Sequence, residues 1–268
     1  MTWEKLLAGL RSTDLERTKR SLALLPLAAF VLLYGVLAFL LDPSWRAAFV
    51  GLALCYFIAF LALGSDWFWA RWYAVGLAWS GFMVGVYGML SIGVVAPLVI
   101  YASLHGLIVL LLRGKKIAAI YEGQQGWRER YCLDEHGANR VGKAVTRTSG
   151  SLPTLVIWAL APKQPESLSM FGTSAALLGH VAVGAALTLA VLGLVSLIRN
   201  RTVGVFYLLA AAASAFVAFP LAGHAATALS NQLELQALLA ASSVVAVAAL
   251  GAAFLPFVRP LAAYLRER

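Results

Sequence analysis

Charged residues are scarce in this chain of 268 residues: they make up 12% of it, whereas 61% of the residues are hydrophobic. A soluble domain has about a quarter of its residues charged and about half apolar. A water-soluble fold of this size has no interior large enough to hide such an excess of apolar side chains. The composition therefore excludes an ordinary soluble domain and predicts that lipid surrounds much of the chain.

Cysteine and catalytic motifs are also scarce. Of the two cysteines, Cys55 lies in an apolar stretch and Cys132 in a polar one, so we expect no disulfide between them. The sequence has no metal-binding cysteine spacing, no HExxH motif, no Ser-His-Asp arrangement and no paired carboxylates within its apolar stretches. We therefore expect no metal site, and no catalytic motif supports an enzyme, although scattered residues can serve lipid-modifying sites.

Basic residues are more frequent than acidic ones, with 21 Lys and Arg against 12 Asp and Glu and a net charge of +9. Such an excess can indicate nucleic-acid binding, but no basic stretch forms a recognisable reader motif. In a membrane protein, the same excess is expected because cytoplasmic loops favour Lys and Arg. We predict no nucleic-acid partner and a multi-pass protein whose immediate partner is the lipid bilayer.

Seven stretches are clear candidates for membrane spans, each of which needs about 20 apolar residues. They cover residues 22–41, 47–63, 73–90, 92–112, 173–198, 203–223 and 237–258. The third and fourth are almost continuous and would form one helix about 60 Å long, which exceeds the bilayer. We therefore expect the chain to fold back around Gly88, Ser91 and Gly93.

The segment 145–162 is ambiguous, because its strictly apolar core is shorter than a span normally requires. The distribution of basic residues favours a crossing. If the segment crosses, Arg46 and Lys163 are the basic residues that face outside. If it does not, the basic residues outside are Arg46, Arg199, Arg201, Arg259, Arg266 and Arg268. The first distribution agrees better with the excess of positive charge in cytoplasmic loops, so we predict a fifth crossing here.

These observations predict an all-α, polytopic transmembrane helix bundle of about eight spans, or seven if 145–162 does not cross, with both termini cytoplasmic. Compact loops and a composition rich in Ala, Leu and Gly favour the bacterial inner membrane. The predicted parts are a cytoplasmic amphipathic segment along the membrane surface (1–20), a four-span half (21–112), a basic cytoplasmic loop (113–144), a second four-span half with a short, Pro-containing first span (145–258) and a basic tail (259–268).

Arg147 is the most suggestive candidate for ligand binding. It lies among Thr146, Thr148 and Ser149, shortly before Pro153, at the start of the predicted fifth span. A short, polar span interrupted by proline resembles the broken helices that line substrate sites in transporters. In the alternative interpretation, Arg147 reaches toward the lipid headgroups and marks the beginning of the span.

Two histidines lie within predicted spans, His105 in the fourth and His180 in the sixth. Ionisable groups inside a membrane are costly and often functional. Their expected depths in the bilayer are similar enough for the two imidazoles to hold a haem iron, so haem b is a candidate cofactor. The alternative is that the two side chains make hydrogen bonds between helices and that no cofactor binds.

Gly81, Gly85 and Gly88 have the small-xxx-small spacing in the third span, which predicts a close helix contact within the chain or with a partner. Taken together, the patterns favour a non-enzymatic structural or accessory component of an inner-membrane assembly. Other membrane subunits or further copies of the chain are the expected partners. The alternatives are a transporter with a site at the broken fifth span, and a b-type haem protein that uses His105 and His180.

Overall fold

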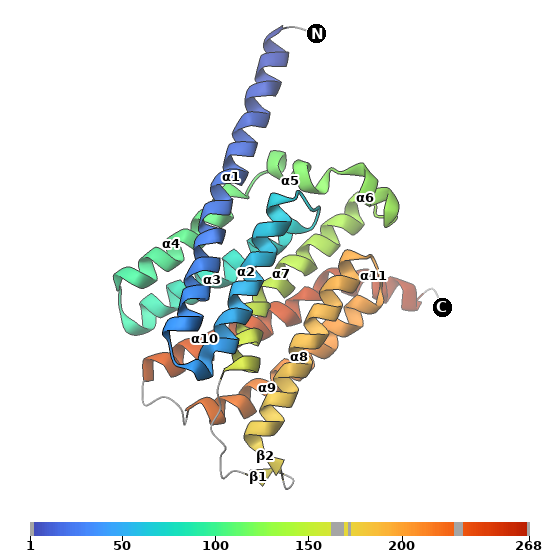
Figure 1. Ribbon diagram of the computed structural model, residues 1–268. Helices are drawn as coiled ribbons and strands as arrows, with labels where there is room; N and C mark the ends of the chain where they lie inside the picture. Colours follow the sequence, from blue (N-terminus) through green and yellow to red (C-terminus); the bar gives the residue numbers. More distant parts are fainter. Residues whose placement is uncertain (1–2, 162–168, 171–172, 228–232, 267–268) are drawn as a thin grey trace.

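The computed structural model describes residues 3–161, 169–170, 173–227 and 233–266, with side chains over 15–161, 177–219 and 242–260. Over these residues the fold is a bundle of α-helices, which confirms the predicted all-α class (Figure 1). The elements other than α-helix are a 3-10 turn, η1 (Pro43–Trp45), and two short strands, β1 (Ser169–Met170) and β2 (Thr173–Ser174), which pair antiparallel. The α-helices are α1 (Trp3–Leu40), α2 (Arg46–Gly64), α3 (Ala70–Ile92), α4 (Ala96–Leu111), α5 (Lys115–Glu122), α6 (Gln125–Arg130), α7 (Glu135–Leu160), α8 (Ala175–Ile198), α9 (Val203–Thr227), α10 (Leu233–Ala253) and α11 (Leu255–Arg266).

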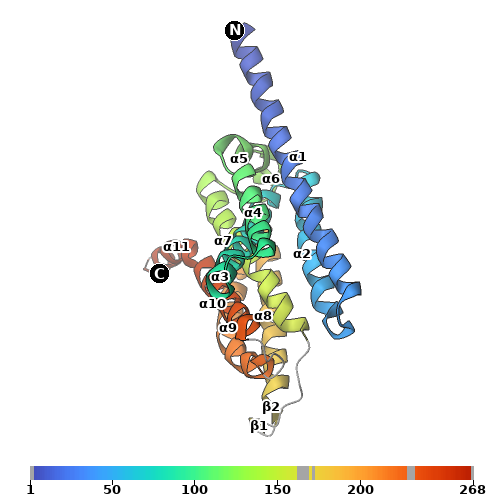
Figure 2. The same ribbon diagram turned by 90° about the vertical axis from the view of Figure 1, so that its left-hand side faces the viewer.

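Helix α1 is continuous from the polar N-terminal segment into the first apolar stretch. Its N-terminal turns project beyond the rest of the bundle, in line with the remainder of the helix, in both views (Figures 1 and 2). A helix that lies along the membrane surface would bend before the span, and the described part of this segment, residues 3–20, shows no such bend; the surface location stays a prediction. Residues 3–20 instead continue the axis of α1.

The α1–α2 pair is held at both ends. At one end, Asp42 accepts a hydrogen bond from the Ser44 backbone N–H (2.8 Å), which caps η1 and turns the chain into α2. At the other end, Arg20 in α1 contacts both carboxylate oxygens of Asp66 (2.5 and 2.6 Å) and donates to the Gly64 carbonyl (2.8 Å). These contacts bind the C-terminal end of α2 to α1.

Helices α3 and α4 form the expected hairpin. The reversal occurs after Ile92, where Gly93 has a φ of +101°. Only glycine takes up such a conformation without steric cost, which explains a glycine at this position. Pro97 lies in the first turn of α4, where its missing N–H leaves no helical hydrogen bond unmade.

The polar segment 113–144 is largely helical: it contains α5, α6 and the first ten residues of α7. Helix α7 therefore begins at Glu135, before the predicted start of the fifth span at residue 145, and Asp134 caps it by accepting from the Gly137 backbone N–H (2.7 Å). Helix α7 contacts α2, α3, α8, α9, α10 and α11, so it occupies the centre of the bundle. Its polar sequence suits that position, because its neighbours rather than lipid surround it.

Among the described residues, five helical segments are long and apolar enough to cross a membrane: Leu15–Leu40, Pro43–Gly64, Ala70–Ile92, Leu177–Ile198 and Ser242–Pro260. Helices α4 and α5 pass the same test as a pair, but they are bent by 75° at their junction, and Val203–Phe219 in α9 is a shorter apolar helix. Large apolar side chains such as Phe39, Leu90 and Phe216 are exposed on the outside of the bundle. A helical bundle with several such helices is the architecture of a membrane-embedded protein.

Candidate functional site

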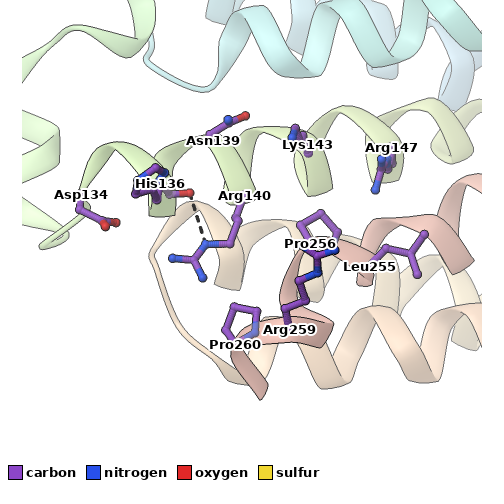
Figure 3. A pocket seen from close by; sticks show the side chains of 10 residues that line it. All are labelled: Asp134, His136, Asn139, Arg140, Lys143, Arg147, Leu255, Pro256, Arg259 and Pro260. Atoms are coloured by element: carbon purple, nitrogen blue, oxygen red, sulfur yellow. Dashed lines mark hydrogen bonds between the residues drawn. The ribbon is translucent and has the colours of Figure 1, made fainter. Parts of the chain in front are cut away.

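The first half of α7 carries a row of basic side chains on one face. His136, Arg140, Lys143 and Arg147 are spaced by four, three and four residues, which places them along one side of a helix. This side faces α11, which contributes Arg259. Figure 3 shows the two helices running past each other, with the Arg140 side chain extending from α7 toward α11.

Between α7 and α11 lies an open cavity of about 760 Å³, which we call the basic groove. Its size falls in the range of ligand pockets, about 300 to 1,000 Å³. Three arginines, one lysine and one carboxylate are among the side chains that line it. The lining residues are Asp134, His136, Asn139, Arg140, Lys143, Arg147, Leu255, Pro256, Arg259 and Pro260 (Figure 3).

Within the described part of the chain, the cations of the basic groove have no carboxylate partner. Among the described side chains, the ion pairs are Lys19–Glu16, Arg20–Asp66 and Arg71–Glu122, and no groove cation takes part in them. The one carboxylate of the groove, that of Asp134, accepts the capping hydrogen bond of α7. Arg140 donates to the backbone carbonyl of His136 (3.3 Å) within its own helix. Over the side chains that the structure describes, the groove is therefore a concave surface with an excess of positive charge.

Arg147 lies at the inner end of this groove. Its Nη1 donates to the Ala252 carbonyl (2.6 Å), one of the last carbonyls of α10. Terminal carbonyls have no partner within their own helix and carry the negative end of the helix dipole, so a guanidinium is well suited to bind them. Arg147 thus joins α7 to the end of α10. The interpretation that it only marks the start of a span misses this contact.

A second cavity adjoins Arg147 from the other side. It measures about 270 Å³, lies between α3, α7 and α10, and is lined almost entirely by apolar or small residues; we call it the apolar cavity. Trp79 and Met83, which are 44% and 45% exposed, stand at its edge on the outer surface of α3. Its lining consists of Gly76, Trp79, Ser80, Met83, Thr146, Arg147, Gly150, Val245 and Ala249. Arg147 and its neighbourhood therefore connect a polar space with an apolar one.

Most of the hydroxyl groups beside Arg147 bond to carbonyls of their own helix. Thr146 Oγ1 donates to the Gly142 carbonyl (2.9 Å), Ser149 Oγ to the Thr146 carbonyl (3.1 Å) and Ser151 Oγ to the Thr148 carbonyl (2.7 Å). Thr148 is fully buried, and its hydroxyl has no hydrogen-bond partner. Serine and threonine commonly bond back to carbonyls of their own helix in this way. The hydroxyls of Thr146, Ser149 and Ser151 are thus bonded within α7, whereas that of Thr148 is left without a partner.

The break predicted at Pro153 is absent. Helix α7 continues as one helix from Glu135 to Leu160 with Pro153 inside it. Close packing on several sides outweighs the local cost of proline, because α7 is enclosed by its neighbours. A transporter site at this position would therefore lie on a continuous helix, and the transporter alternative stays a prediction.

The two candidate haem ligands are on helices with different neighbours. Helix α4, which carries His105, packs against α3 and α1, whereas α8, which carries His180, packs against α9 and α7. His105 is completely buried, and both its ring nitrogens are engaged, Nδ1 with the Tyr101 carbonyl and Nε2 with the Tyr56 hydroxyl (both 2.8 Å). A carbonyl only accepts, so Nδ1 donates and Nε2 accepts from Tyr56. The structure does not bring the two histidines together.

His105 instead belongs to a buried aromatic cluster. Its ring lies 4.0 Å from that of Phe30 and 4.3 Å from that of Tyr101, centroid to centroid. Tyr34 completes the cluster through a contact of 3.3 Å between its hydroxyl and that of Tyr101. The cluster links α1, α2 and α4, and the hydrogen bond between Tyr56 and His105 joins α2 to α4.

The small residues of α3 face two helices. Gly81 lies against the His105 ring and Gly85 against Ala102, both in α4, and Gly88 is buried. A closer backbone approach, which the sequence pattern does not single out, occurs between α3 and α7. A Cβ on Gly150 would lie 3.0 Å from the Gly76 carbonyl oxygen, and a Cβ on Gly76 would meet the Thr146 carbonyl. Glycine at both positions allows α7 to sit directly on α3.

A further group of polar contacts, around Arg71, was not visible in the sequence. Arg71, at the start of α3, donates to the Leu112 carbonyl (2.9 Å) at the end of α4 and pairs with Glu122 of α5. Trp72 donates to the same carboxylate (2.9 Å). Tertiary packing, rather than spacing along the chain, joins these three helix ends.

Comparison with known proteins adds no relative: no protein-family model, no curated protein and no solved structure matches the chain. The described residues contain no group of three or more His, Cys, Asp or Glu side chains placed to hold a metal ion. The basic groove with its adjoining apolar cavity is therefore the best-defined candidate site.

Proposed function

We propose that the protein is a non-enzymatic structural or accessory component of a bacterial inner-membrane assembly. The observation that carries the proposal is the projection of α1 beyond the bundle (Figures 1 and 2). A helical extension of about a dozen residues that lacks tertiary support is only marginally stable in water. A partner that packs along residues 3–14 would supply that support, so the extension is suited to hold another subunit.

The topology that accompanies this proposal has eight crossings and cytoplasmic termini. The crossing helices are α1, α2, α3, α4, α7, α8, α9 and α10. Inclusion of α7 is supported by its central place in the bundle, and it leaves Arg46 and Lys163 as the basic residues outside. The projecting part of α1, the helices α5 and α6, and the basic groove then lie on the cytoplasmic side, where positive charge is favoured.

Crosslinking tests the accessory role. A photoreactive residue at Leu6 or Leu10 in the projecting part of α1 is expected to give a crosslinked product of defined mass in native membranes. Matched positions at Leu32 and Phe39 on the exposed face of the same helix serve as controls for contacts with lipid and random neighbours. Deletion of residues 3–13 is expected to reduce the size of the native complex while the purified bundle stays folded. Absence of any product at Leu6 and Leu10, with an unchanged complex after deletion, would contradict the proposal.

The two native cysteines allow a direct test of topology. Cys132 is exposed and Cys55 is buried. A membrane-impermeant maleimide is expected to label Cys132 only after the membrane is opened. In a Cys132→Ser background, Lys163→Cys is expected to react from the periplasmic side of intact spheroplasts. Protection of position 163 from the external reagent would exclude the eight-span topology.

A further inference from the structure

We propose that the basic groove and the apolar cavity together bind one anionic phospholipid, with the phosphate among the groove cations and an acyl chain in the apolar cavity. Assignment of this lipid to the cytoplasmic leaflet rests on the proposed topology, whereas binding itself does not. The accessory role and the lipid site are therefore independent.

The charge of the groove selects an anion. Arg140, Lys143, Arg147 and Arg259 converge on one space without a carboxylate partner among the described residues. Guanidinium groups bind phosphate oxygens through paired N–H donors, and a lysine adds a compact positive charge. Arg147 donates to the Ala252 carbonyl through Nη1, and its other N–H groups could donate to a ligand. This chemistry suits a phosphate group.

The adjoining cavity distinguishes a lipid from a free anion. A soluble phosphate would make no favourable contact with an apolar space lined by Trp79, Met83 and Val245. An acyl chain would fill it and would leave toward the bilayer past the exposed side chains of Trp79 and Met83. Arg147 lines both spaces, so it stands where the polar and apolar parts of a phospholipid meet.

The position of the groove also suits a lipid headgroup. It lies between the N-terminal part of α7 and α11 (Figure 3). Helix α11 follows the apolar helix α10 in the chain. Basic pockets at the cytoplasmic ends of transmembrane helices are known to take anionic headgroups. The groove is open, so a headgroup would have direct access to its cations.

The proposal is tested with the purified full-length protein in a neutral detergent. Phosphatidylglycerol is titrated, with phosphatidylcholine as the zwitterionic control, and bound lipid is counted by native mass spectrometry alongside the thermal unfolding midpoint. Phosphatidylglycerol is expected to be retained at one molecule per chain and to raise the midpoint, whereas phosphatidylcholine does neither. Equal retention of both lipids would overturn the proposal.

Two variants probe the two halves of the site. Arg140→Gln with Lys143→Gln is expected to weaken phosphatidylglycerol binding about thirtyfold, since each cation near a membrane surface contributes about a factor of five. The charge-matched control, Lys115→Gln with Lys116→Gln on α5, should bind normally. Val245→Phe, which fills the apolar cavity, is expected to lower lipid retention while the groove stays intact. Normal lipid binding by both site variants would overturn the proposal.

Inorganic phosphate separates a lipid from a soluble anion. At millimolar concentration, inorganic phosphate is expected to compete weakly with phosphatidylglycerol in the wild type. Val245→Phe is expected to leave the binding of phosphate unchanged. If phosphate stabilises the protein as strongly as phosphatidylglycerol does, the groove takes a soluble anion and the lipid assignment is wrong. This outcome would leave the accessory role of α1 untouched, because crosslinking reports on that role separately.

Discussion

Arg71 and Arg147 make the same kind of contact at two places in the bundle, but the charged side chains around them differ. Each donates to a carbonyl at the C-terminal end of a neighbouring helix, Arg71 to Leu112 and Arg147 to Ala252. Arg71 is also neutralised by Glu122, whereas Arg147 stands in a groove with three further cations and no carboxylate partner within the described residues. In the first region a carboxylate neutralises the guanidinium, and in the second no described carboxylate does so.

The difference in solvent access explains why both arrangements are tolerated. The side chains of Arg71 and Glu122 are only 19% and 25% exposed, so either charge alone would lose much of its hydration. The groove is open, and Lys143 and Arg259 are exposed, so these cations keep their contact with solvent. Removal of a charge should therefore cost stability in the first region and binding in the second.

The largest effect is expected for Arg71→Gln. This change leaves the carboxylate of Glu122 in a mostly enclosed site and removes the bond to Leu112, so it should lower the free energy of unfolding by about 2 to 3 kcal/mol. Titration with a denaturing detergent measures the loss. Addition of Glu122→Gln should restore part of it, because the amide keeps an acceptor for Trp72 without the charge. A double variant less stable than Arg71→Gln would contradict this account.

A smaller loss is expected for Arg147→Gln. The bond between a guanidinium and a helix-terminal carbonyl is worth about 1.5 kcal/mol, and no carboxylate is left behind. The same titration should show a loss of about that size. In contrast to Arg71→Gln, the variant should also retain less phosphatidylglycerol. A stability loss as large as that of Arg71→Gln would contradict the distinction between an enclosed ion pair at Arg71 and an open groove at Arg147.

Arg20→Gln tests an ion pair of intermediate exposure. Asp66 is 45% exposed, so the pair should contribute about 1 kcal/mol or less. The loss should shrink at high salt, because ions screen an exposed pair more than an enclosed one. Measurement of the unfolding free energy at low and high salt, with Arg71→Gln as the reference, checks this. Equal salt sensitivity of the two variants would contradict the distinction.

The smallest change in stability is expected for the double variant at Arg140 and Lys143. Both side chains reach into an open groove of like charge, so without lipid the unfolding free energy should stay within about 0.5 kcal/mol of wild type. The variant should nevertheless lose the stabilisation by phosphatidylglycerol. A loss above 2 kcal/mol without lipid would assign these residues to the packing of the bundle.

Some features of the fold could be predicted from local patterns. The apolar stretches predict the helices, and the turn between α3 and α4 lies at Gly93, within the interval where helix length demands a reversal. Hydropathy predicted the bounds of α7 less well, because hydropathy indicates which residues favour contact with lipid. A helix at the centre of a bundle faces protein, so its polar first half was taken for a loop and its proline for a break.

The candidate site could be predicted only in part. Arg147 was singled out from its unusual place in the chain, but Arg140, Lys143 and Arg259 were counted as ordinary basic residues near the membrane surface. The pairing of His105 with His180 failed because equal depth in a bilayer does not make two helices neighbours. Depth follows from counting residues along a span, whereas adjacency depends on how the helices pack.

The sequence by itself determined that this protein is an all-α bundle with apolar helices, and it determined which residues share one face of each helix. Both follow from local physics: apolar length, and a repeat of 3.6 residues per turn. Only the tertiary structure decided that the basic face of α7 lies opposite Arg259. It also decided that Arg71 pairs with Glu122, whereas Arg147 has no carboxylate partner among the described residues. Such pairings depend on close approach at positions like Gly76 and Gly150, where small residues let two helices meet, and periodicity along one helix does not specify its neighbour.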